Sequence, residues 1–313
     1  MDGVLVIDKP EGPTSHDIVA QVRRVLRVKR VGHTGTLDPM ATGVLPLVIG
    51  RATRLTQFFS RDSKTYNATI RLGFSTDTYD ALGIPAGSNG DPSLDLSHEL
   101  GDQVIESVLN NFRGTFDQCP PPFSAKKIGG IRAYTIARRG GPVVTVPVQV
   151  TVDQLRLLKA ENSRLQVEIT CSSGFYVRSL AHDIGQMLGC GAHLQALRRT
   201  RSGEFDLAHA IPLERAVQGS SEVKNMVNPA PSPIVDRILP LSGLLRALPS
   251  AILTSRGRRC ASNGQPINQD ELTHIDEVTG IATSRVRLFD ESGQLVAIAE
   301  KMEGALHPRV VLV

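Results

Sequence analysis

The chain has 313 residues, of which 41% are hydrophobic and 21% charged, and its formal net charge is +4. This aliphatic content excludes a disordered chain, and no apolar run approaches the roughly 20 residues that span a bilayer, which excludes a helical membrane protein. A chain of this length is typical of two domains, each large enough to bury a core.

The sequence carries no pattern of export or of a metal centre. Its first residues contain no basic segment followed by a long apolar one, so we expect no signal peptide. The cysteines, which are Cys119, Cys171, Cys190 and Cys260, lie far apart and lack the paired spacing of a zinc site. We therefore expect reduced cysteines in a cytoplasmic protein that uses no metal or organic cofactor.

The first elements in the chain are a strand and an amphipathic helix. Residues 3–8 form a short apolar run, which is typical of a strand, and a turn rich in Pro and Gly follows over residues 9–13. Ser15 is the expected N-cap of the next helix. Apolar residues recur at helical spacing from Ile18 to Leu26, where a basic run ends the helix.

The middle of the chain mixes strands and helices. Residues 31–50, rich in Gly, Thr and Pro, predict a loop that closes on an apolar stretch, and residues 73–92 are rich in turn formers. The three predicted strands cover residues 65–72, 143–152 and 164–171, and the two predicted helices cover residues 100–112 and 179–188. Because these elements lack a regular βαβ rhythm, we expect an α+β fold on a mostly antiparallel mixed sheet.

The last part of the chain changes character. Residues 218–233 are dominated by Gly, Ser, Asn and Pro and predict a linker. Two apolar-rich runs with turn residues between them predict a hairpin over residues 286–299. We therefore expect a first domain over residues 1–240, which includes the linker, and a small β domain over residues 241–313.

One carboxylate stands out in the loop between residues 32 and 43, which reads GHTGTLDPMATG. Asp38 lies before a proline and among glycines, where an aspartate is most often a turn former. The loop lacks the GxxxxGK[ST] and GxGxxG patterns of phosphate-binding loops and the local signature of a serine or cysteine nucleophile. Besides the turn, the remaining interpretation is a carboxylate that works alone, as a nucleophile or a base at a sugar.

Basic residues occur in clusters. Five of the eight residues from 23 to 30 are basic, and the other clusters are Lys126-Lys127, Arg138-Arg139, Arg198-Arg199-x-Arg201 and Arg256-x-Arg258-Arg259. Such clusters fit solvated faces and fit a surface that follows nucleic-acid phosphates equally well. With no Trp and 4% aromatic residues, a long stacking platform for single strands is disfavoured.

The loop around Asp38 closely resembles the central motif of the TruB family of tRNA pseudouridine synthases. Further stretches resemble the other motifs of this family, in the family's order: DKPxGxTS (8–15), KxY (64–66), LGxxTDTxDxxG (72–83), QxPPxFSAK (118–126), CSSGFYVRSLxxDIG (171–185) and LRRxxxGxF (197–205). The resemblance extends over residues 1 to about 215. The region from about Leu241 resembles the small PUA-like β-barrel that often follows this catalytic domain and binds RNA.

The resemblance implies a pseudouridine synthase that isomerises uridine 55 in the T-arm of tRNA by base flipping and a catalytic aspartate, without a cofactor. It implies that Asp38 is the catalytic carboxylate, that Arg178 pairs with it, and that Lys9 shapes the floor of the site. For the target base, it implies that Tyr66 stacks on it, with Tyr176 nearby, and that Leu197 packs against it. It also implies that His33 contacts the RNA beside the flipped nucleotide. Attack on the sugar, attack on the base and abstraction of a sugar proton by Asp38 all stay open.

The expected partner is tRNA, with no obligate protein partner and a monomeric chain. The candidates for contacts to RNA phosphates are Arg23, Arg30, Lys126, Arg198 and Arg256. Two alternatives from other classes remain: a tRNA-binding folding chaperone in which catalysis is secondary, and a related synthase that acts on a different RNA inside a guide-RNA particle.

Overall fold

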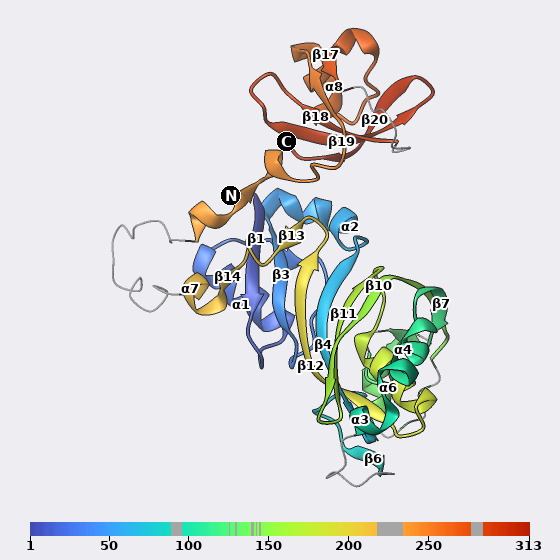
Figure 1. Cartoon of the computed structure of the whole chain (residues 1–313). Coiled ribbons are helices and arrows are strands. Elements are labelled where there is room, and N and C mark those ends of the chain that lie inside the picture. The colour runs from blue at the N-terminus through green and yellow to red at the C-terminus, as the bar shows by residue number, and fades with distance from the viewer. Residues whose placement is uncertain are drawn as a thin grey trace, which may run out of the picture.

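A computed structural model describes residues 1–88, 96–124, 126–128, 130–138, 141, 143, 145–217, 234–276 and 284–313. Within these residues, one large sheet has the strand order β14-β1-β3-β12-β4-β11-β10-β7, with β2, β13 and β15 attached beside it (Figure 1). Its strands are β1 (Gly3–Lys9), β2 (Val31–His33), β3 (Thr42–Ile49), β4 (Lys64–Leu72), β7 (Gly114–Gln118), β10 (Val148–Glu161), β11 (Arg164–Cys171), β12 (Ala192–Ser202), β13 (Phe205–Asp206), β14 (Ile211–Pro212) and β15 (Leu239–Pro240).

Helices and three smaller sheets complete the fold. The helices are α1 (Ser15–Leu26), α2 (Thr56–Phe59), α3 (Leu96–Leu100), α4 (Asp102–Asn110), α5 (Ala133–Arg138), α6 (Val177–Met187), α7 (Leu213–Val217) and α8 (Ser255–Ser262). Two short hairpins are formed by β5 (Phe74–Thr76) with β6 (Pro85–Ser88) and by β8 (Lys127–Ile128) with β9 (Ile131–Arg132). The C-terminal sheet contains β16 (Ser250–Leu253), β17 (Leu272–Ile275), β18 (Arg285–Phe289), β19 (Leu295–Met302) and β20 (Ala305–Val311).

The predicted α+β class is confirmed by the strand pairing. In the large sheet β1 is parallel to β14 and β3 is parallel to β12, whereas the other described pairs are antiparallel. The strands predicted over residues 65–72 and 164–171 correspond to β4 and β11, and the predicted C-terminal hairpin corresponds to β18 and β19.

The first strand, β1, contributes side chains to two different apolar cores. Leu5 and Ile7 point to the larger apolar cluster, which includes buried residues of α1 and α6. Val4 and Val6 alternate with them and point to a second cluster that also contains Leu312 near the C-terminus. Because side chains alternate across a strand, β1 is buried on both faces, and it links the large sheet to the C-terminal sheet.

The C-terminal sheet is held to the first part of the chain by more than apolar packing. Arg51 Nη1 donates a hydrogen bond of 2.6 Å to the carbonyl oxygen of Leu312, and Glu204 Oε1 accepts one of 2.9 Å from the backbone N–H of Leu245. Figure 1 shows this sheet standing at the end of β1, where the N- and C-termini lie near each other. The two parts therefore meet in a continuous buried junction.

Two sequence predictions near the N-terminus are wrong in detail. The N-cap of α1 is Thr14, whose side chain accepts a hydrogen bond from Asp17 N, whereas Ser15 lies inside the helix and is buried. The predicted loop over residues 31–50 contains β2 and β3. The apolar end of this stretch pairs with β1, and burial in the sheet overrides the loop-like composition.

Other element boundaries also shift. The helix predicted over residues 100–112 corresponds to α4, which begins at Asp102 because Gly101, with a φ of 72°, separates it from α3. The strand predicted over residues 143–152 begins at Val148 and continues to Glu161 because it pairs along the whole of β11. The helix predicted from Ser179 begins at Val177, so Arg178 lies in its first turn.

The predicted linker over residues 218–233 lies outside the described residues, as do Ala125 and Arg139. Within the part of the chain that the structure describes, no helix is long and apolar enough to cross a membrane.

Gly43 provides a test of the close contact between β3 and β12. Its φ is 100°, and a Cβ atom there would lie 2.1 Å from the carbonyl oxygen of Arg199. We expect Gly43→Ala to lower the free energy of unfolding by about 2 kcal/mol or more, because backbone strain adds to a steric clash. Gly12 is the matched control, since its φ is 106° and a Cβ there would meet nothing within 4 Å. Equal losses in urea titrations of the two variants would contradict the clash.

Candidate active site

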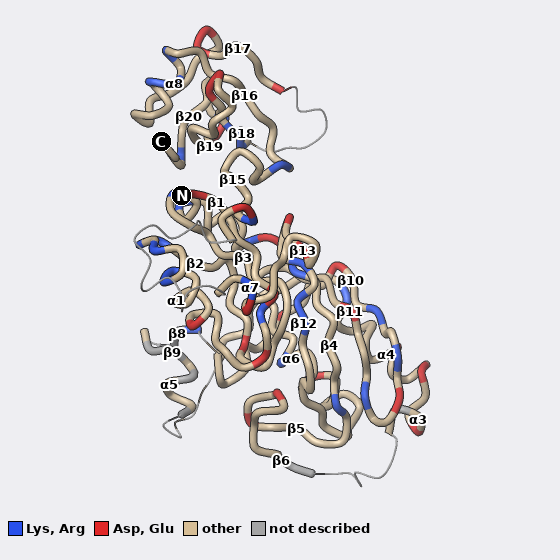
Figure 2. Tube along the Cα trace, turned by 90° about the vertical axis from the view of Figure 1, so that its left-hand side faces the viewer, with Lys and Arg blue, Asp and Glu red and all other residues tan. Residues whose placement is uncertain are grey.

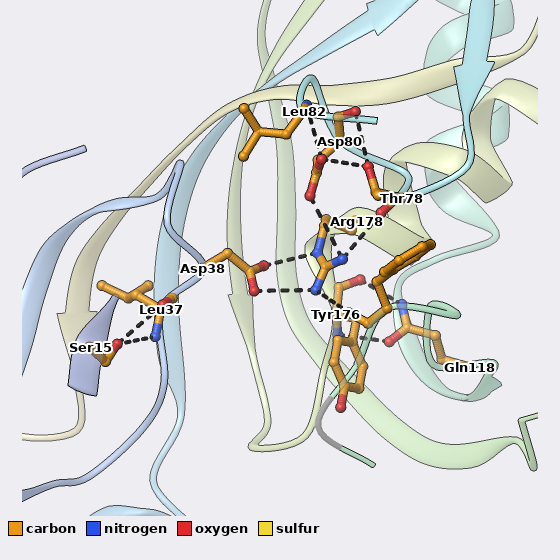
Figure 3. Close-up of polar contacts among 10 residues, drawn as sticks. Ser15, Leu37, Asp38, Thr78, Asp80, Leu82, Gln118, Tyr176 and Arg178 are labelled. Atoms are coloured by element: carbon orange, nitrogen blue, oxygen red, sulfur yellow. Dashed lines mark hydrogen bonds and ion pairs between the residues drawn. The ribbon is translucent and has the colours of Figure 1, made fainter. Parts of the chain in front are cut away.

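Asp38 lies in the loop of residues 34–41, which joins β2 to β3, and Ser15 fixes this loop next to Asp38. The buried hydroxyl oxygen of Ser15 accepts a 2.9 Å hydrogen bond from Leu37 N and lies 3.1 Å from Leu37 O, to which it donates (Figure 3). The first turn of α1 therefore holds both backbone groups of the residue before Asp38.

Lys9 fixes the other side of the loop. Its ammonium group, at the end of β1, is fully buried and donates to the carbonyl oxygens of Pro10, Pro39 and Ala41 at 2.9, 3.0 and 2.7 Å. Burial lowers the pKa of Lys9 to about 8, although the charge of Asp38 acts in the opposite direction. The residue predicted to shape the floor of the site thus bonds the backbone on the far side of Asp38.

The guanidinium of Arg178 lies against the carboxylate of Asp38. Arg178 Nε is 2.9 Å from Asp38 Oδ2, and Arg178 Nη2 donates to Asp38 Oδ1 at 3.2 Å (Figure 3). The Arg178 side chain is only 7% exposed, whereas that of Asp38 is 36% exposed. A planar guanidinium that meets both carboxylate oxygens fixes their orientation and leaves the carboxylate accessible.

Arg178 is itself held by groups from other loops. It donates to Thr78 O and to Phe123 O, both at 3.1 Å, and Arg178 Nη1 lies 3.7 Å from Asp80 Oδ2. Asp80 is buried and accepts hydrogen bonds from Thr78 Oγ1 at 2.6 Å and Leu82 N at 3.1 Å. Sequence reasoning assigned no role to Asp80, although this carboxylate stands in the LGxxTDTxDxxG stretch.

The two tyrosines lie on different elements around Asp38. Tyr176 precedes α6, and its backbone N–H and carbonyl bond the side-chain amide of Gln118 at 2.8 and 3.0 Å. Tyr66 lies in β4, directly opposite Arg199 of β12. Burial raises the pKa of both phenols, and the negative charge of Asp38 adds to this increase in each case.

Leu197 and His33 lie on strands beside this group. Leu197 of β12 is buried opposite Ala68 of β4, and His33 ends β2. Burial, with the charges of Arg199 and His16, lowers the pKa of His33, and its Nδ1 has no hydrogen-bond partner among the described residues. Within those residues, no hydrogen bond or ion pair joins either side chain to Asp38.

The predicted phosphate contacts differ in their surroundings. Arg23, Arg30 and Lys126 are exposed, and Figure 2 shows Lys and Arg gathered where α1 ends. Arg198 makes hydrogen bonds of 3.1 and 2.8 Å to the two carboxylate oxygens of Asp8, and Arg256 Nε lies 3.2 Å from Glu271 Oε1. The last two arginines are therefore already engaged in ion pairs.

One member of the predicted basic clusters is not on the surface. Arg199 is 1% exposed and donates to Val44 O at 2.7 Å and to Gly35 O at 3.1 Å. Lys64 is also buried and donates to Ser60 O and Asp62 O, and burial lowers its pKa to about 8. Sequence reasoning missed both as interior cations. Among the described residues, no group of three His, Cys, Asp or Glu could hold a metal ion.

Family models and curated relatives match most or all of this chain. The family model described as TruB family pseudouridylate synthase (N terminal domain) matches residues 23–177, and that of the tRNA pseudouridylate synthase B C-terminal domain matches residues 178–246. The chain is 44% identical to tRNA pseudouridine synthase B of Solibacter usitatus and 40% identical to that of Aquifex aeolicus, covering 100% of each pair of chains. The chain belongs to the TruB family.

Solved structures resemble this TruB-family chain over almost its whole length. A chain of a Cbf5-Nop10-Gar1 complex is 26% identical, with a TM-score of 0.74, and the match covers 99% of this chain and 85% of that one. A chain of an H/ACA RNP bound to a substrate RNA containing 2'-deoxyuridine is 25% identical, with a TM-score of 0.72 and the same coverage. The predicted fold class therefore agrees with solved structures that match 99% of this chain.

The buried ammonium of Lys9 predicts a pH dependence of stability in this TruB-family chain. The pKa of Lys9 is about 8 in the folded chain, whereas in the unfolded chain it has the ordinary value of 10.5. Between these two pH values the unfolded chain therefore binds more protons than the folded chain. Across this window the contribution of Lys9 to the free energy of unfolding rises with pH, and below pH 8 its burial cost is fully present.

We therefore expect the free energy of unfolding of wild type, relative to Lys9→Met, to rise by about 2 kcal/mol from pH 7 to pH 10. Lys159→Met, which removes an exposed partner of Glu161, is the control and is expected to show no such rise. A pH-independent difference for Lys9→Met would mean that the three carbonyl oxygens keep the ammonium protonated as in water.

Proposed function

We propose that the chain isomerises uridine 55 in the T-arm of tRNA to pseudouridine, with Asp38 as the catalytic carboxylate. The observation that carries the proposal is the partly exposed Asp38 held in two contacts by the buried Arg178, in a chain whose relatives are named tRNA pseudouridine synthase B. Isomerisation breaks the bond between the ribose and N1 of the base, rotates the base and bonds its C5 to the ribose, while C5 loses a proton and N1 takes one up.

The surroundings of Asp38 suit each route that a carboxylate can take in this reaction. Attack on the sugar, attack on the base and abstraction of a sugar proton all require a carboxylate oxygen held still beside the substrate. Arg178 supplies the orientation and a compensating charge, and the bonds of Ser15 and Lys9 hold the loop on both sides.

The side chains around Asp38 suit a nucleobase that has left its stack. A base in a folded RNA loop must be extruded before its glycosidic bond can be reached, at a cost of a few kcal/mol. In this proposal Tyr66 stacks on the extruded uracil, Tyr176 and Leu197 complete the apolar walls, and His33 contacts the neighbouring RNA. The neutral imidazole favoured by the lowered pKa of His33 suits a contact with a base.

The C-terminal sheet is the second part of the proposed RNA contact. We assign residues 1–240 to the catalytic domain and residues 241–313 to a PUA-like domain that contacts phosphates of the acceptor stem. Helix α8 carries Arg256, Arg258 and Arg259, although Arg256 and Arg258 also pair with Glu271 and Asp290. Phosphate contacts of this kind add affinity with little base specificity.

The catalytic assignment is tested by the release of tritium from tRNA that carries uridine labelled at C5. We expect wild type to release tritium without any guide RNA and Asp38→Asn to release none, because an amide offers no anionic oxygen to the sugar or the base. Affinity for tRNA should stay within about tenfold, since phosphate contacts dominate binding.

The control for this experiment is Asp206→Asn, which changes an exposed carboxylate that bonds His209. A transcript with cytidine at position 55 should release no tritium from the T-arm. Normal release by Asp38→Asn would refute the role of Asp38, and binding without release by wild type would favour the chaperone or a guide-dependent synthase.

The basic end of α1 predicts a separate effect on RNA affinity. Replacing Arg23 and Arg30 together by Ser should weaken tRNA binding, lower the slope of log K against log salt by about 2, and leave kcat unchanged. The double variant Arg156→Ser/Lys159→Ser removes the same charge from β10 and is the control. Equal salt slopes for the two double variants would place the phosphate contacts elsewhere.

A further inference from the structure

The turn between β5 and β6 is joined to α6 by a ring stack. The rings of Tyr79 and His182 are nearly parallel, with an interplanar angle of 8° and centroids 3.8 Å apart. His182 lies one helical turn after Arg178 on α6, and Tyr79 lies between Thr78 and Asp80. The stack therefore connects the helix that carries Arg178 to the turn that supplies its acceptors.

Tyr79 has an unusual backbone conformation. Its φ is 64°, in the left-handed region that bulky side chains rarely adopt. Hydrogen bonds fix the turn around it: Tyr79 N donates to Thr76 O at 3.2 Å, and Leu194 N donates to Tyr79 O at 3.0 Å. Such a conformation persists only where the surroundings define it strongly. Here it brings the residues on both sides of Tyr79 to the same atom of Arg178.

That atom is Nη1 of Arg178. It donates to Thr78 O at 3.1 Å and lies 3.7 Å from Asp80 Oδ2, whereas Nε and Nη2 of the same guanidinium contact Asp38 (Figure 3). Because the guanidinium is rigid and planar, acceptors that hold Nη1 restrict where Nε and Nη2 can lie. The turn at Tyr79, together with Phe123 O at Nη2, thus restrains the orientation of the group that holds Asp38.

The imidazole of His182 is suited to packing. Its Nδ1 is buried and has no hydrogen-bond partner among the described residues, and burial lowers its pKa, which favours the neutral ring. A buried polar atom without a hydrogen-bond partner costs free energy. We therefore attribute the position of the His182 ring to the contact that its face makes. The face contact that the structure shows is the stack on Tyr79.

We propose that Tyr79 and His182 are positioning residues for the reaction at Asp38. Their stack holds residues 77–80 against α6, so that Thr78 and Asp80 orient Arg178, and Arg178 in turn orients Asp38. Neither ring contacts the substrate. This inference rests on the proposed function, because it assigns the purpose of the stack to catalysis by Asp38.

The test compares variants that remove or keep the stacking face. We expect Tyr79→Ser to lower kcat for tritium release by about tenfold or more with KM within about twofold, because Asp38 is misplaced while RNA binding is intact. Tyr79→Phe keeps the ring and should restore kcat. His182→Ala should resemble Tyr79→Ser, and the double variant should be no slower than either, since both remove one contact.

A second ring contact in the chain provides the matched control. Phe205 and His209 have ring centroids 6.5 Å apart at 88°, and among the described residues His209 pairs with Asp206 rather than with Arg178, Thr78 or Asp80. His209→Ala should therefore leave kcat unchanged. Tyr79→Gly, which suits the positive φ, replaces Tyr79→Ser if that variant does not fold. Wild-type kcat in the folded Tyr79 variant, or an equal loss in His209→Ala, would overturn the proposal.

A crystal structure of the Tyr79→Ser variant (or of Tyr79→Gly in its place) separates this inference from the proposed function. We expect Arg178 to leave Thr78 O and to lose at least one of its two contacts with Asp38. Unchanged contacts would overturn the positioning role even if wild type proved inactive on tRNA. If the contacts are displaced but wild type has no synthase activity, the proposed function is refuted, whereas the link between the Tyr79–His182 stack and Arg178 stands.

Discussion

The arrangement of the site depends on cations buried among backbone carbonyl groups. Lys9, Lys64, Arg178 and Arg199 are the Lys and Arg residues buried within the described part of the chain, and each donates to one or more carbonyl oxygens. A buried charge is costly in free energy unless its N–H donors have acceptors. If the loops that supply these oxygens moved away, the buried cations would lose their acceptors. Fixed loops around the carboxylate are the result.

The two halves of the large sheet each contribute one member of the central ion pair. Asp38 belongs to the loop between β2 and β3, whereas Arg178 belongs to α6, which follows β11. Strand β12 pairs with β3 on one side and β4 on the other, which joins the halves. The pairing of β12 thus brings together the two halves that carry the charged groups, and Gly43 permits the close approach of β3 to β12.

The sequence predicts the strands that alternate cleanly, such as β4 and β11, because their period identifies a buried face. It does not predict β3, which follows a loop rich in Gly and Thr and itself begins with Thr42 and Gly43, although pairing with β1 buries its apolar residues. Asp38 could be singled out by its motif, but Arg199 could not be distinguished from Arg198 in a basic run. Alternation along β12 sends one inward to Val44 O and the other outward to Asp8.

The junction between β1 and the C-terminal sheet has a consequence for the order in which the chain is made. Val4 and Leu312 are both fully buried in the same apolar cluster, and β1 also pairs with β15 near residue 240. Val4 leaves the ribosome long before Leu312, because the two residues lie far apart in the sequence. During that interval one face of β1 lacks its final cover, so the growing chain exposes apolar surface that calls for protection by chaperones.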